Sequence, residues 1–401
     1  FFGPLYGAYL FHLAERCRHK KIRRLFFLSR EGRTLFELWN DLRPWLPHSA
    51  TLPPAVFLEA SRSAMAPCAC ATDGLTPAFA RIAFLPAGSR DARDLARIYG
   101  LNPTQMARWL ARYHLQPDTP LSRFHPGWQA DHNRRLDRML EDPGFQADVR
   151  DGARPTHTAL LHYLESLDFF GGGDVALADI GWLGTLQHYL FQAIRQRADK
   201  PRLHGVLFAS AGNFPFPLGP DNLLEGFLFD RFRFEFSGSL VMMARPLFEE
   251  SLRADQPGLL GYAPDPDGCR LIHRDPTDAV SRQESEQHRY YAPLQEGIRD
   301  AVRRFGPALR ISGFNPADLR PWFHVLLNRH VAFPSTRDIR ALRFKSHIND
   351  FSGGHQPRAA VLNATRGLWD LPVWQLHLPG IRWYHYLRHA VALLRQPPVA
   401  P

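Results

Sequence analysis

Three polar segments of this chain follow short apolar runs, and each carries residue types that bind phosphate or transfer a proton. They are Arg30 and Glu31 after the run 25–28, Arg62 soon after the run 55–58, and Asp179 at the end of the run 174–179. An arginine fork binds two oxygens of a phosphate group at once. A carboxylate can accept a proton or hold a hydrated Mg²⁺ ion. These residues therefore indicate chemistry on a phosphorylated substrate.

The segment after Asp179 is the most informative of the three. Residues 180–185 read Ile-Gly-Trp-Leu-Gly-Thr and precede a helical pattern that runs to about residue 195. Glycines and a threonine at a helix start can aim backbone N–H groups and a hydroxyl at one anion, assisted by the helix dipole. An ordinary strand-to-helix turn with Thr185 near the cap fits the same pattern, so both interpretations stay open. His188, one turn into the helix, either faces a substrate or, as we favour, lies at the surface.

Strand-like runs alternate with helical patterns through the first half of the chain. Strands are expected at 25–28, 55–58, 174–179 and 203–209, and helices at 5–19, 34–42 and 185–195. This alternation predicts an α/β fold with a mostly parallel sheet, whose ligands lie at the carboxyl ends of the strands. Arg30, Arg62 and Asp179 would then share one rim. For each of them singly, the alternative is a solvated loop charge.

The remaining segments predict further divisions of the chain. Residues 63–155 indicate a helical insertion, with helices around 92–115 and 130–141. We expect an α/β domain over 1–235 and a mixed, mainly helical region over 236–401 that supplies an acceptor-binding lobe. Beyond the α/β domain, helices are expected at 286–306 and 318–330, and a turn is expected at 264–268. The aromatic stretch 227–236 is typical of packed loops or irregular strands.

Composition limits the class of partner. The 401 residues carry 49 basic and 39 acidic side chains, a net charge of +10, which favours a phosphorylated substrate, a nucleic acid or an acidic membrane surface. Scattered arginines disfavour nucleic acid. The sequence contains no G-x-S-x-G, Walker A or G-x-G-x-x-G motif, which disfavours a serine hydrolase, a P-loop protein or a Rossmann dehydrogenase. Four cysteines are too few for a disulfide framework in a chain of this length, so we expect them to be reduced. The sequence shows no signal peptide and no apolar run of ~18 residues, and we therefore expect a cytoplasmic chain that is cut from a longer one.

The end of the chain alternates aromatic and basic residues. The residues concerned are Arg382, Trp383, Tyr384, Tyr386, Arg388 and Arg395. Such a segment can rest on an anionic membrane surface as a peripheral contact. A packed terminal helix with a basic outer face is the alternative, and the sequence favours it.

Several of these segments resemble a known group of proteins. The residues that carry the resemblance lie at 2–11, 25–32, 60–62, 178–187 and 249–262. They resemble the region that follows the haloacid-dehalogenase phosphatase domain in bacterial surface-polysaccharide biosynthesis proteins. The resemblance implies a phosphatase domain upstream or a partner phosphatase, and it accounts for a chain that starts without methionine.

The α/β half also resembles a type I phosphoribosyltransferase in the order of its elements. The resemblance implies that Ser29, Arg30, Glu31, Gly32 and Arg62 bind the pyrophosphate of phosphoribosyl pyrophosphate. The 5-phosphate would lie on the loop of Gly181, Trp182, Leu183, Gly184 and Thr185, with Asp179 on the ribose and Asp179 and Glu31 as Mg²⁺ ligands. That family usually has two adjacent acids in the loop, whereas Ile180 follows Asp179 here. Glu31 or another carboxylate would compensate.

Together the two resemblances imply a glycosyltransferase of the phosphoribosyltransferase type. The chain would move 5-phosphoribose to a sugar hydroxyl of a growing, lipid-linked or free glycan such as an O-antigen or capsule, with Arg30, Glu31 and Asp179 as catalytic residues. A phosphatase would then leave a β-ribofuranoside. Two alternatives stay open: a nucleotide-sugar-dependent glycosyltransferase, and a non-catalytic glycan-binding module.

Overall fold

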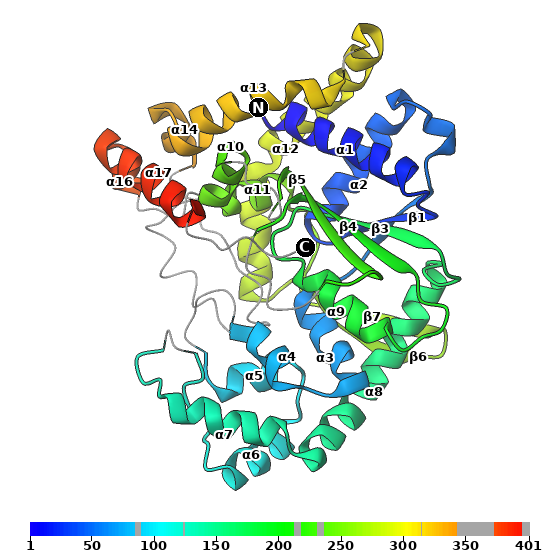
Figure 1. Cartoon of the computed structure of the whole chain (residues 1–401), viewed down its shortest axis with the longest axis vertical. Helices are drawn as coiled ribbons and strands as arrows, with labels where there is room; N and C mark the ends of the chain where they lie inside the picture. Colours follow the sequence, from blue (N-terminus) through cyan, green and yellow to red (C-terminus); the bar gives the residue numbers. More distant parts are fainter. Residues whose placement is uncertain are drawn as a thin grey trace.

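The computed structural model describes residues 1–84, 90–122, 125–211, 218–230, 236–313, 315–342 and 373–394. At its centre lies a five-stranded sheet in the order β2-β1-β3-β4-β5, with every neighbouring pair parallel (Figure 1). The strands are β1 (Arg24–Leu28), β2 (Ala55–Leu58), β3 (Asp174–Asp179), β4 (Arg202–Ala209) and β5 (Asn222–Phe229). The predicted α/β fold with a parallel sheet is confirmed.

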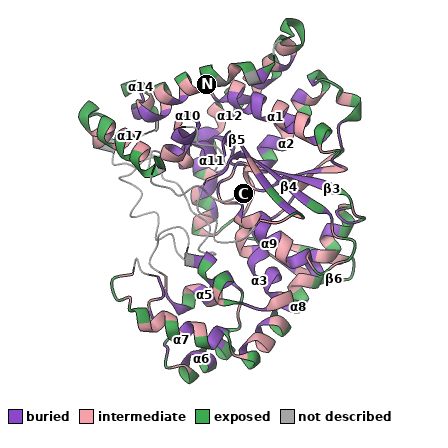
Figure 2. Cartoon of the chain, in the orientation of Figure 1, coloured by how far each residue is buried: buried purple, intermediate pink, exposed green. Residues whose placement is uncertain are grey.

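Alternating strand residues feed two separate cores, one on each face of the sheet. Phe27, Ala178 and Phe208 belong to one core, whereas Phe26 and Leu177 belong to the other. Because successive side chains of a strand point to opposite faces, runs that are apolar throughout can bury both faces. Figure 2 shows the buried strands in the middle and exposed residues on the outer sides of the helices.

The first core is covered by helices from both ends of the chain. They are α1 (Phe2–His19), α2 (Glu31–Leu42), α11 (Arg245–Leu252) and α12 (Ala279–Ser312). The long helix α12 packs against α1, α2 and α11. Tyr6 ties the ends together, since its hydroxyl lies 2.6 Å from Ser251 Oγ. The core therefore continues across residue 235, and the C-terminal region helps to position the strand ends.

The second core lies under α3 (Arg62–Asp73), α8 (Pro143–Ser166) and α9 (Thr185–Ile194). Helix α3 packs on both α8 and α9. Between α3 and α8 the chain forms the helices of the insertion, namely α4 (Pro77–Ala80), α5 (Ala92–Ile98), α6 (Pro103–Arg112) and α7 (Ala130–Leu140). Helices α6 and α7 lie at the end of the molecule opposite α13 (Figure 1).

The rest of the C-terminal region contains a hairpin and short helices. Strands β6 (Leu259–Asp265) and β7 (Gly268–His273) pair antiparallel and pack against α8, so the predicted turn at 264–268 is confirmed. The helices are α10 (Phe236–Ser239), α13 (Arg320–Leu327), α14 (Thr336–Leu342), α16 (Val373–Leu376) and α17 (Pro379–Leu394). Within the described ranges, no helix is both long enough and apolar enough to cross a lipid bilayer.

Some elements differ from the expectations. The helical segments expected around 92–115 are two helices, α5 and α6, whereas the 24-residue α8 was not expected as a helix. Residues 227–229, expected in loops or irregular strands, end strand β5, while 231–235 lie outside the described residues. The tail helix is present as α17, and Arg395 lies outside the described part.

Candidate functional site

The carboxyl ends of β2, β1 and β3 lie side by side because these strands are parallel neighbours. Glu31 begins α2 after β1, Arg62 begins α3 after β2, and Asp179 ends β3. The charges of Glu31 and Arg62 both act on the Asp179 carboxyl group. These three residues, which are far apart in the sequence, therefore meet at one edge of the sheet.

Asp179 is the most perturbed acid at this edge. Although solvent reaches part of the residue, its carboxyl group lies deep in the protein, and burial raises its pKa to about 8. The negative charges of Glu31 and Glu249 raise this pKa further. The Ile180 N–H donates to Asp179 Oδ1 at 2.7 Å, and this hydrogen bond lowers the pKa, as does the positive charge of Arg62. A buried acid surrounded by other acids gains stability when a cation or a hydroxyl donor arrives.

The carboxylates of Asp179 and Glu31 fit a divalent cation that is bound by the protein and the substrate together. No set of three His, Cys, Asp or Glu side chains among the described residues is arranged around a common metal position. Mg²⁺ in substrate sites, however, is often held by only one or two carboxylates together with substrate phosphates and waters. The repulsion between Asp179 and Glu31 is of the kind that such an ion relieves. The two residues fit Mg²⁺ bound together with a diphosphate.

The loop after β3 is fixed against the end of β4. Gly181 has a φ of +142°, and a Cβ atom there would lie 2.4 Å from the Ala209 carbonyl oxygen. The Ala211 N–H donates to the Trp182 carbonyl oxygen at 2.7 Å. Gly184, with a φ of +65°, is the N-cap of α9. Glycine is required at Gly181 both by the backbone angle and by the close approach.

The same loop presents unused donors at the start of a helix. Among the described residues, no protein acceptor bonds the backbone N–H groups of residues 182–185. The N-cap Gly184 has no side chain that could make a cap hydrogen bond, and Thr185 is the first residue of α9. Helix starts with free N–H groups attract anions. This arrangement favours the phosphate interpretation over an ordinary cap at Thr185.

The loop after β1 is also held in place by its own residues. Ser29 Oγ donates to the Ala60 carbonyl oxygen at 2.6 Å and accepts the Ala60 N–H at 3.0 Å, so the hydroxyl joins the ends of β1 and β2. At Gly32, a Cβ atom would lie 3.0 Å from the Phe27 carbonyl carbon. The bonds Ser29-Arg30 and Gly181-Trp182 are both cis. Ser29 and Gly32 therefore shape the loop, while Arg30 and Glu31 carry its charge.

The C-terminal region adds residues that the sequence analysis did not assign to the site. Trp182 Nε1 donates to Glu249 Oε1 at 2.5 Å, and Arg30 Nη1 pairs with Glu284 Oε1 at 2.6 Å. Glu249 lies in a segment that carried the resemblance, but no role was attached to it. The available signal was Glu249-Glu250, two adjacent acids that follow Leu247 and Phe248 in α11.

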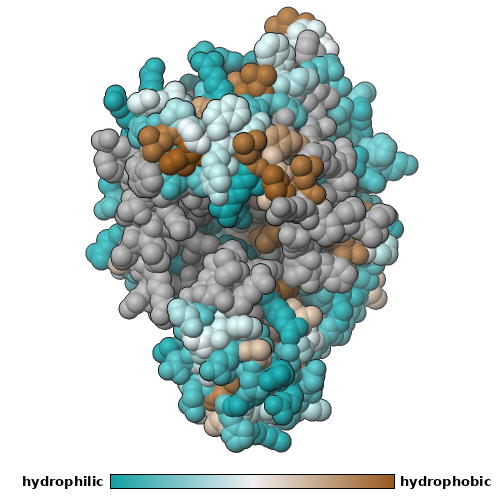
Figure 3. All heavy atoms as spheres, turned by 60° about the vertical axis from the view of Figure 1, so that its left-hand side comes forward, coloured by the Kyte–Doolittle hydropathy of each residue, from teal (hydrophilic) through white to brown (hydrophobic). Residues whose placement is uncertain are grey.

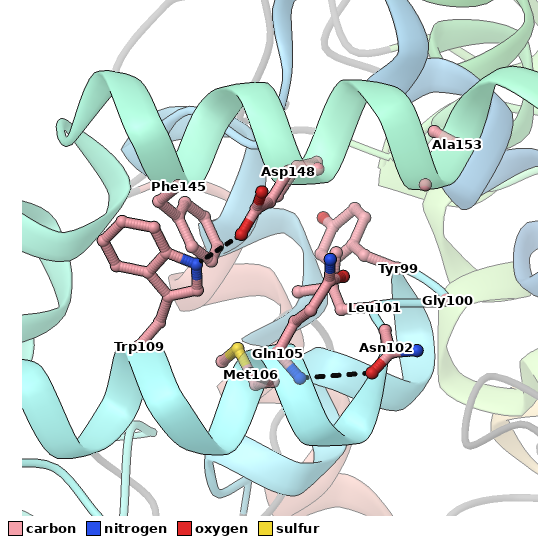
Figure 4. Close-up of a pocket in the computed structure, with 12 residues that line it drawn as sticks. Tyr99, Gly100, Leu101, Asn102, Gln105, Met106, Trp109, Phe145, Asp148 and Ala153 are labelled. Carbon is pink, nitrogen blue, oxygen red and sulfur yellow. Dashed lines mark hydrogen bonds between the residues drawn. The ribbon is translucent and has the colours of Figure 1, made fainter.

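One further predicted candidate, His188, and one cavity that the sequence did not predict lie outside this edge. His188 is buried rather than on the surface, and burial lowers its pKa to about 4, so the surface interpretation is wrong. A separate cavity lies between α6 and α8, walled by Tyr99, Met106 and Phe145 (Figure 4). There Trp109 Nε1 donates to Asp148 Oδ2 at 2.9 Å. This cavity has no cationic lining residue, so it does not suit a phosphate.

A comparison with protein-family models finds no match to the chain, and a comparison with curated proteins finds none either. The functional argument therefore rests on the sheet edge itself.

Proposed function

We propose that the carboxyl edge of the sheet binds phosphoribosyl pyrophosphate with Mg²⁺ and that the chain transfers 5-phosphoribose to a sugar hydroxyl of a glycan. The observation that carries this proposal is the convergence of Asp179, Glu31 and Arg62 beside the N–H groups of residues 182–185, to which no acceptor in the described part of the chain bonds. This arrangement suits a phosphorylated pentose, because the acid can bind the ribose hydroxyls and the helix start can bind the phosphate. The resemblance to type I phosphoribosyltransferases agrees with this arrangement.

Each part of the donor has residues suited to it. The loop of Gly181 to Thr185 would receive the 5-phosphate, and Asp179 would accept hydrogen bonds from the ribose hydroxyls. Arg30 and Arg62 would bind the diphosphate. Asp179 and Glu31 would hold Mg²⁺, which supplies positive charge against the departing diphosphate.

The transfer itself needs little covalent chemistry from the protein. The bond between ribose C1 and the diphosphate oxygen breaks with its electron pair leaving on the diphosphate, and the acceptor hydroxyl oxygen forms the new bond to C1. Glu31 takes the hydroxyl proton as general base where Asp179 alone holds Mg²⁺, because a Mg²⁺-bound carboxylate is a poor base. Attack opposite the leaving group converts an α-donor into a β-ribofuranoside. Positioning and charge neutralisation supply most of the rate enhancement.

The 5-phosphate that remains on the product requires a second reaction. A haloacid-dehalogenase-type phosphatase, as a neighbouring domain or a separate protein, would remove it. The acceptor would be a glycan of a surface polysaccharide, such as an O-antigen or capsule.

A peripheral membrane contact would bring a lipid-linked acceptor to this site. The outward side of α17 exposes Tyr384, Leu387 and Leu394, and Figure 3 brings this side of the molecule forward with hydrophobic side chains at its surface. Arg388, one turn after Tyr384 on α17, is exposed as well. An apolar, basic surface of this kind suits an anionic membrane.

The test is thermal stabilisation and product formation with phosphoribosyl pyrophosphate and Mg²⁺. We expect a selective rise in melting temperature, smaller with ribose 5-phosphate and absent with nucleoside diphosphates, that Asp179→Ala and Thr185→Ala abolish. Stabilisation by a nucleoside diphosphate alone would replace the proposal with a nucleotide-sugar transferase. Glycan binding without turnover, unaffected by Arg30→Ala, would indicate a binding module.

A further inference from the structure

A histidine–carboxylate pair lies at the carboxyl edge of the sheet, outside the residues assigned above. His273, the last residue of β7, has its Nε2 atom 2.6 Å from Glu59 Oε2, and Glu59 directly follows β2. The two side chains are 34% and 24% exposed, so both solvent and a ligand can reach them. The pair joins the α/β half to the C-terminal region, and ligand sites occur preferentially where two such parts of a protein meet.

Glu59 is held in place through its main chain. Its N–H donates to the Tyr163 hydroxyl oxygen at 3.0 Å, and its carbonyl oxygen accepts a hydrogen bond from the Tyr262 hydroxyl at 2.9 Å. Burial raises the pKa of both tyrosines, so they stay neutral and add no charge beside the carboxylate. Two aromatic side chains, from α8 and β6, therefore fix the backbone that carries the carboxylate of Glu59.

Glu59 is also tied to the loop after β1. The next residue, Ala60, bonds Ser29 Oγ through its N–H at 3.0 Å and through its carbonyl oxygen at 2.6 Å. Strand β1 separates β2 from β3, and neighbouring strands lie about 4.8 Å apart. The end of β2 is therefore roughly 10 Å from the end of β3, where Asp179 lies. A phosphorylated sugar at Asp179 and an acceptor beside Glu59 fit within this span.

His273 is tied to the same edge from the hairpin. Leu259 pairs with His273 across the two strands, and the Leu259 carbonyl oxygen accepts a hydrogen bond from the Ser61 hydroxyl at 2.7 Å. Ser61 is the N-cap of α3 and immediately precedes Arg62. The hydrogen bonds of β6 therefore place His273 beside the start of α3, next to the residues that converge on Asp179.

The pairing decides which ring nitrogen of His273 can take a proton. Because Glu59 accepts the proton on Nε2, Nδ1 carries a lone pair. Within the described ranges, no protein group bonds Nδ1. Two other charged groups near the hairpin have partners elsewhere, since Arg274 pairs with Glu284 and His162 bonds the turn of the hairpin. A carboxylate on one nitrogen orients the imidazole and stabilises the imidazolium that forms when the other nitrogen is protonated.

We propose that His273 is the general base for the acceptor hydroxyl and that Glu59 is the residue that positions it. The proposal rests on the proposed function for the identity of the reaction. When Asp179 and Glu31 both hold Mg²⁺, neither is a good base, and the transfer needs another group to take the proton. Nδ1 of His273 takes it from the acceptor hydroxyl while the acceptor oxygen bonds ribose C1 and the diphosphate leaves with its electron pair. The imidazolium then gives the proton to solvent.

The test is diphosphate release from phosphoribosyl pyrophosphate and Mg²⁺, with water and methyl glycosides of common hexoses as acceptors. Glutamine in His273→Gln can still donate to Glu59, so this variant should bind the donor as the wild type does, while kcat falls by about 10²–10⁴-fold. His162→Gln is the matched control, because His162 contacts the same hairpin at the Gly268 carbonyl oxygen, and it should leave kcat unchanged. An unchanged kcat in His273→Gln would overturn the proposal.

Glu59→Gln separates a positioning role from a structural ion pair. Glutamine can still accept the Nε2–H, but it carries no charge, so the imidazolium is less stable and the pKa of the base falls. We expect kcat to drop at least about tenfold and the rise of the rate with pH to move to lower pH. An exposed pair of purely structural importance would change the melting temperature slightly and leave the pH profile in place, and that result counts against the proposal.

The outcomes for the base and for the donor are separable. Equal release of diphosphate from phosphoribosyl pyrophosphate by the wild type and His273→Gln would contradict the base and support the proposed function. Turnover of a nucleotide sugar alone, at a rate that falls in His273→Gln, would support the base and contradict the proposed function. No turnover with either donor would contradict both.

The tautomer of His273 gives a test that needs no donor. In protein labelled with ¹⁵N-histidine, nuclear magnetic resonance identifies the protonated ring nitrogen, and the signals missing from His273→Gln belong to His273. We expect the proton on Nε2 and a lone pair on Nδ1. A neutral ring that is protonated on Nδ1 would overturn the proposal, because Nε2 faces Glu59 and not the acceptor.

Discussion

The indole N–H of Trp182 donates to the carboxylate of Glu249 across 2.5 Å, and this bond joins the loop after β3 to helix α11. The charge of Glu249 also raises the pKa of Asp179. One residue of the C-terminal region therefore both holds the loop that would receive the 5-phosphate and affects the acid that would hold the ribose. The protonation of Asp179 becomes sensitive to a residue seventy positions further along the chain.

Glu249→Gln should shift the pH dependence of donor binding. Glutamine can still accept the Trp182 N–H, but it carries no charge, so the pKa of Asp179 falls from about 8. More of the acid is then ionised at neutral pH, and phosphoribosyl pyrophosphate with Mg²⁺ should bind about threefold more tightly at pH 7 than it does to the wild type. Binding isotherms between pH 6 and pH 9 measure the shift.

Trp182→Phe is the companion variant, because it breaks the same bond and keeps the charge of Glu249. Its binding should weaken at every pH without a shift of the profile. If Glu249→Gln and Trp182→Phe gave the same profile, the electrostatic role of Glu249 would be wrong.

Asp179→Asn should stabilise the protein at alkaline pH. The pKa of Asp179 is about 8 in the folded chain, above the ordinary value of 3.8, so the folded state binds this proton more tightly than the unfolded state. Stability therefore falls as pH rises between these values, and the full cost is present above pH 8. We expect the variant to match the wild type near pH 4 and to melt on the order of several degrees higher at pH 9.

Asp199→Asn provides a control of opposite sign. The hydrogen bond from Arg197 lowers the pKa of Asp199, so ionised Asp199 favours the folded state above its pKa. Replacing it should lower stability slightly at neutral pH and have no effect in acid. A melting difference for Asp179→Asn that did not grow with pH would contradict the buried-acid explanation.

The strands that bear the site were predictable because parallel strands buried on both faces read as short apolar runs. β2 and β3 have the predicted bounds, and β1 and β4 each begin one residue earlier. β5 was not predicted because Glu225 and Gly226 interrupt its apolar run, and in the fold Glu225 pairs with Arg16 of α1. Helix α8 was missed because Pro155 and Gly152 lie inside it, and burial against α3 outweighs their low helix propensity.

The site was only half predictable for a related reason. Arg30, Arg62 and Asp179 follow strands, and the order of a parallel sheet is enough to bring strand ends together. Nothing local in the sequence connects Arg30 to Glu284, because they are 254 positions apart and meet only through the packing of α12. Long-range ion pairs of this kind depend on the tertiary fold and not on any periodic pattern.

Gly181→Ala should disrupt the loop after β3. A methyl group would lie 2.4 Å from the Ala209 carbonyl oxygen, and the φ of +142° disfavours any residue with a Cβ atom. We expect a loss of about 2–4 kcal/mol in the free energy of unfolding and loss of ribose 5-phosphate binding. Urea denaturation and a binding assay check the two effects.

Gly297→Ala is the matched control for that substitution. Gly297 lies within α12, and no atom would approach its added methyl group within 4 Å. Alanine has a higher helix propensity, so this variant should gain up to about 1 kcal/mol. Similar losses in both variants would show that the close approach at Gly181 is not the cause.

The outward side of α17 should bind anionic vesicles. Leu387 and Leu394 are 58% and 71% exposed, and burying a leucine side chain in a lipid interface contributes roughly 1.5–3 kcal/mol. The double variant Leu387→Ser and Leu394→Ser should therefore bind phosphatidylglycerol vesicles at least about tenfold more weakly than the wild type, at an unchanged melting temperature. Ile311→Ser is the control, because Ile311 is even more exposed, at 88%, but lies near the end of α12. Co-sedimentation at low and high salt separates the charge contribution, which should weaken as salt rises. Equal binding by the double variant, or equal binding to neutral vesicles, would exclude this surface as the membrane contact.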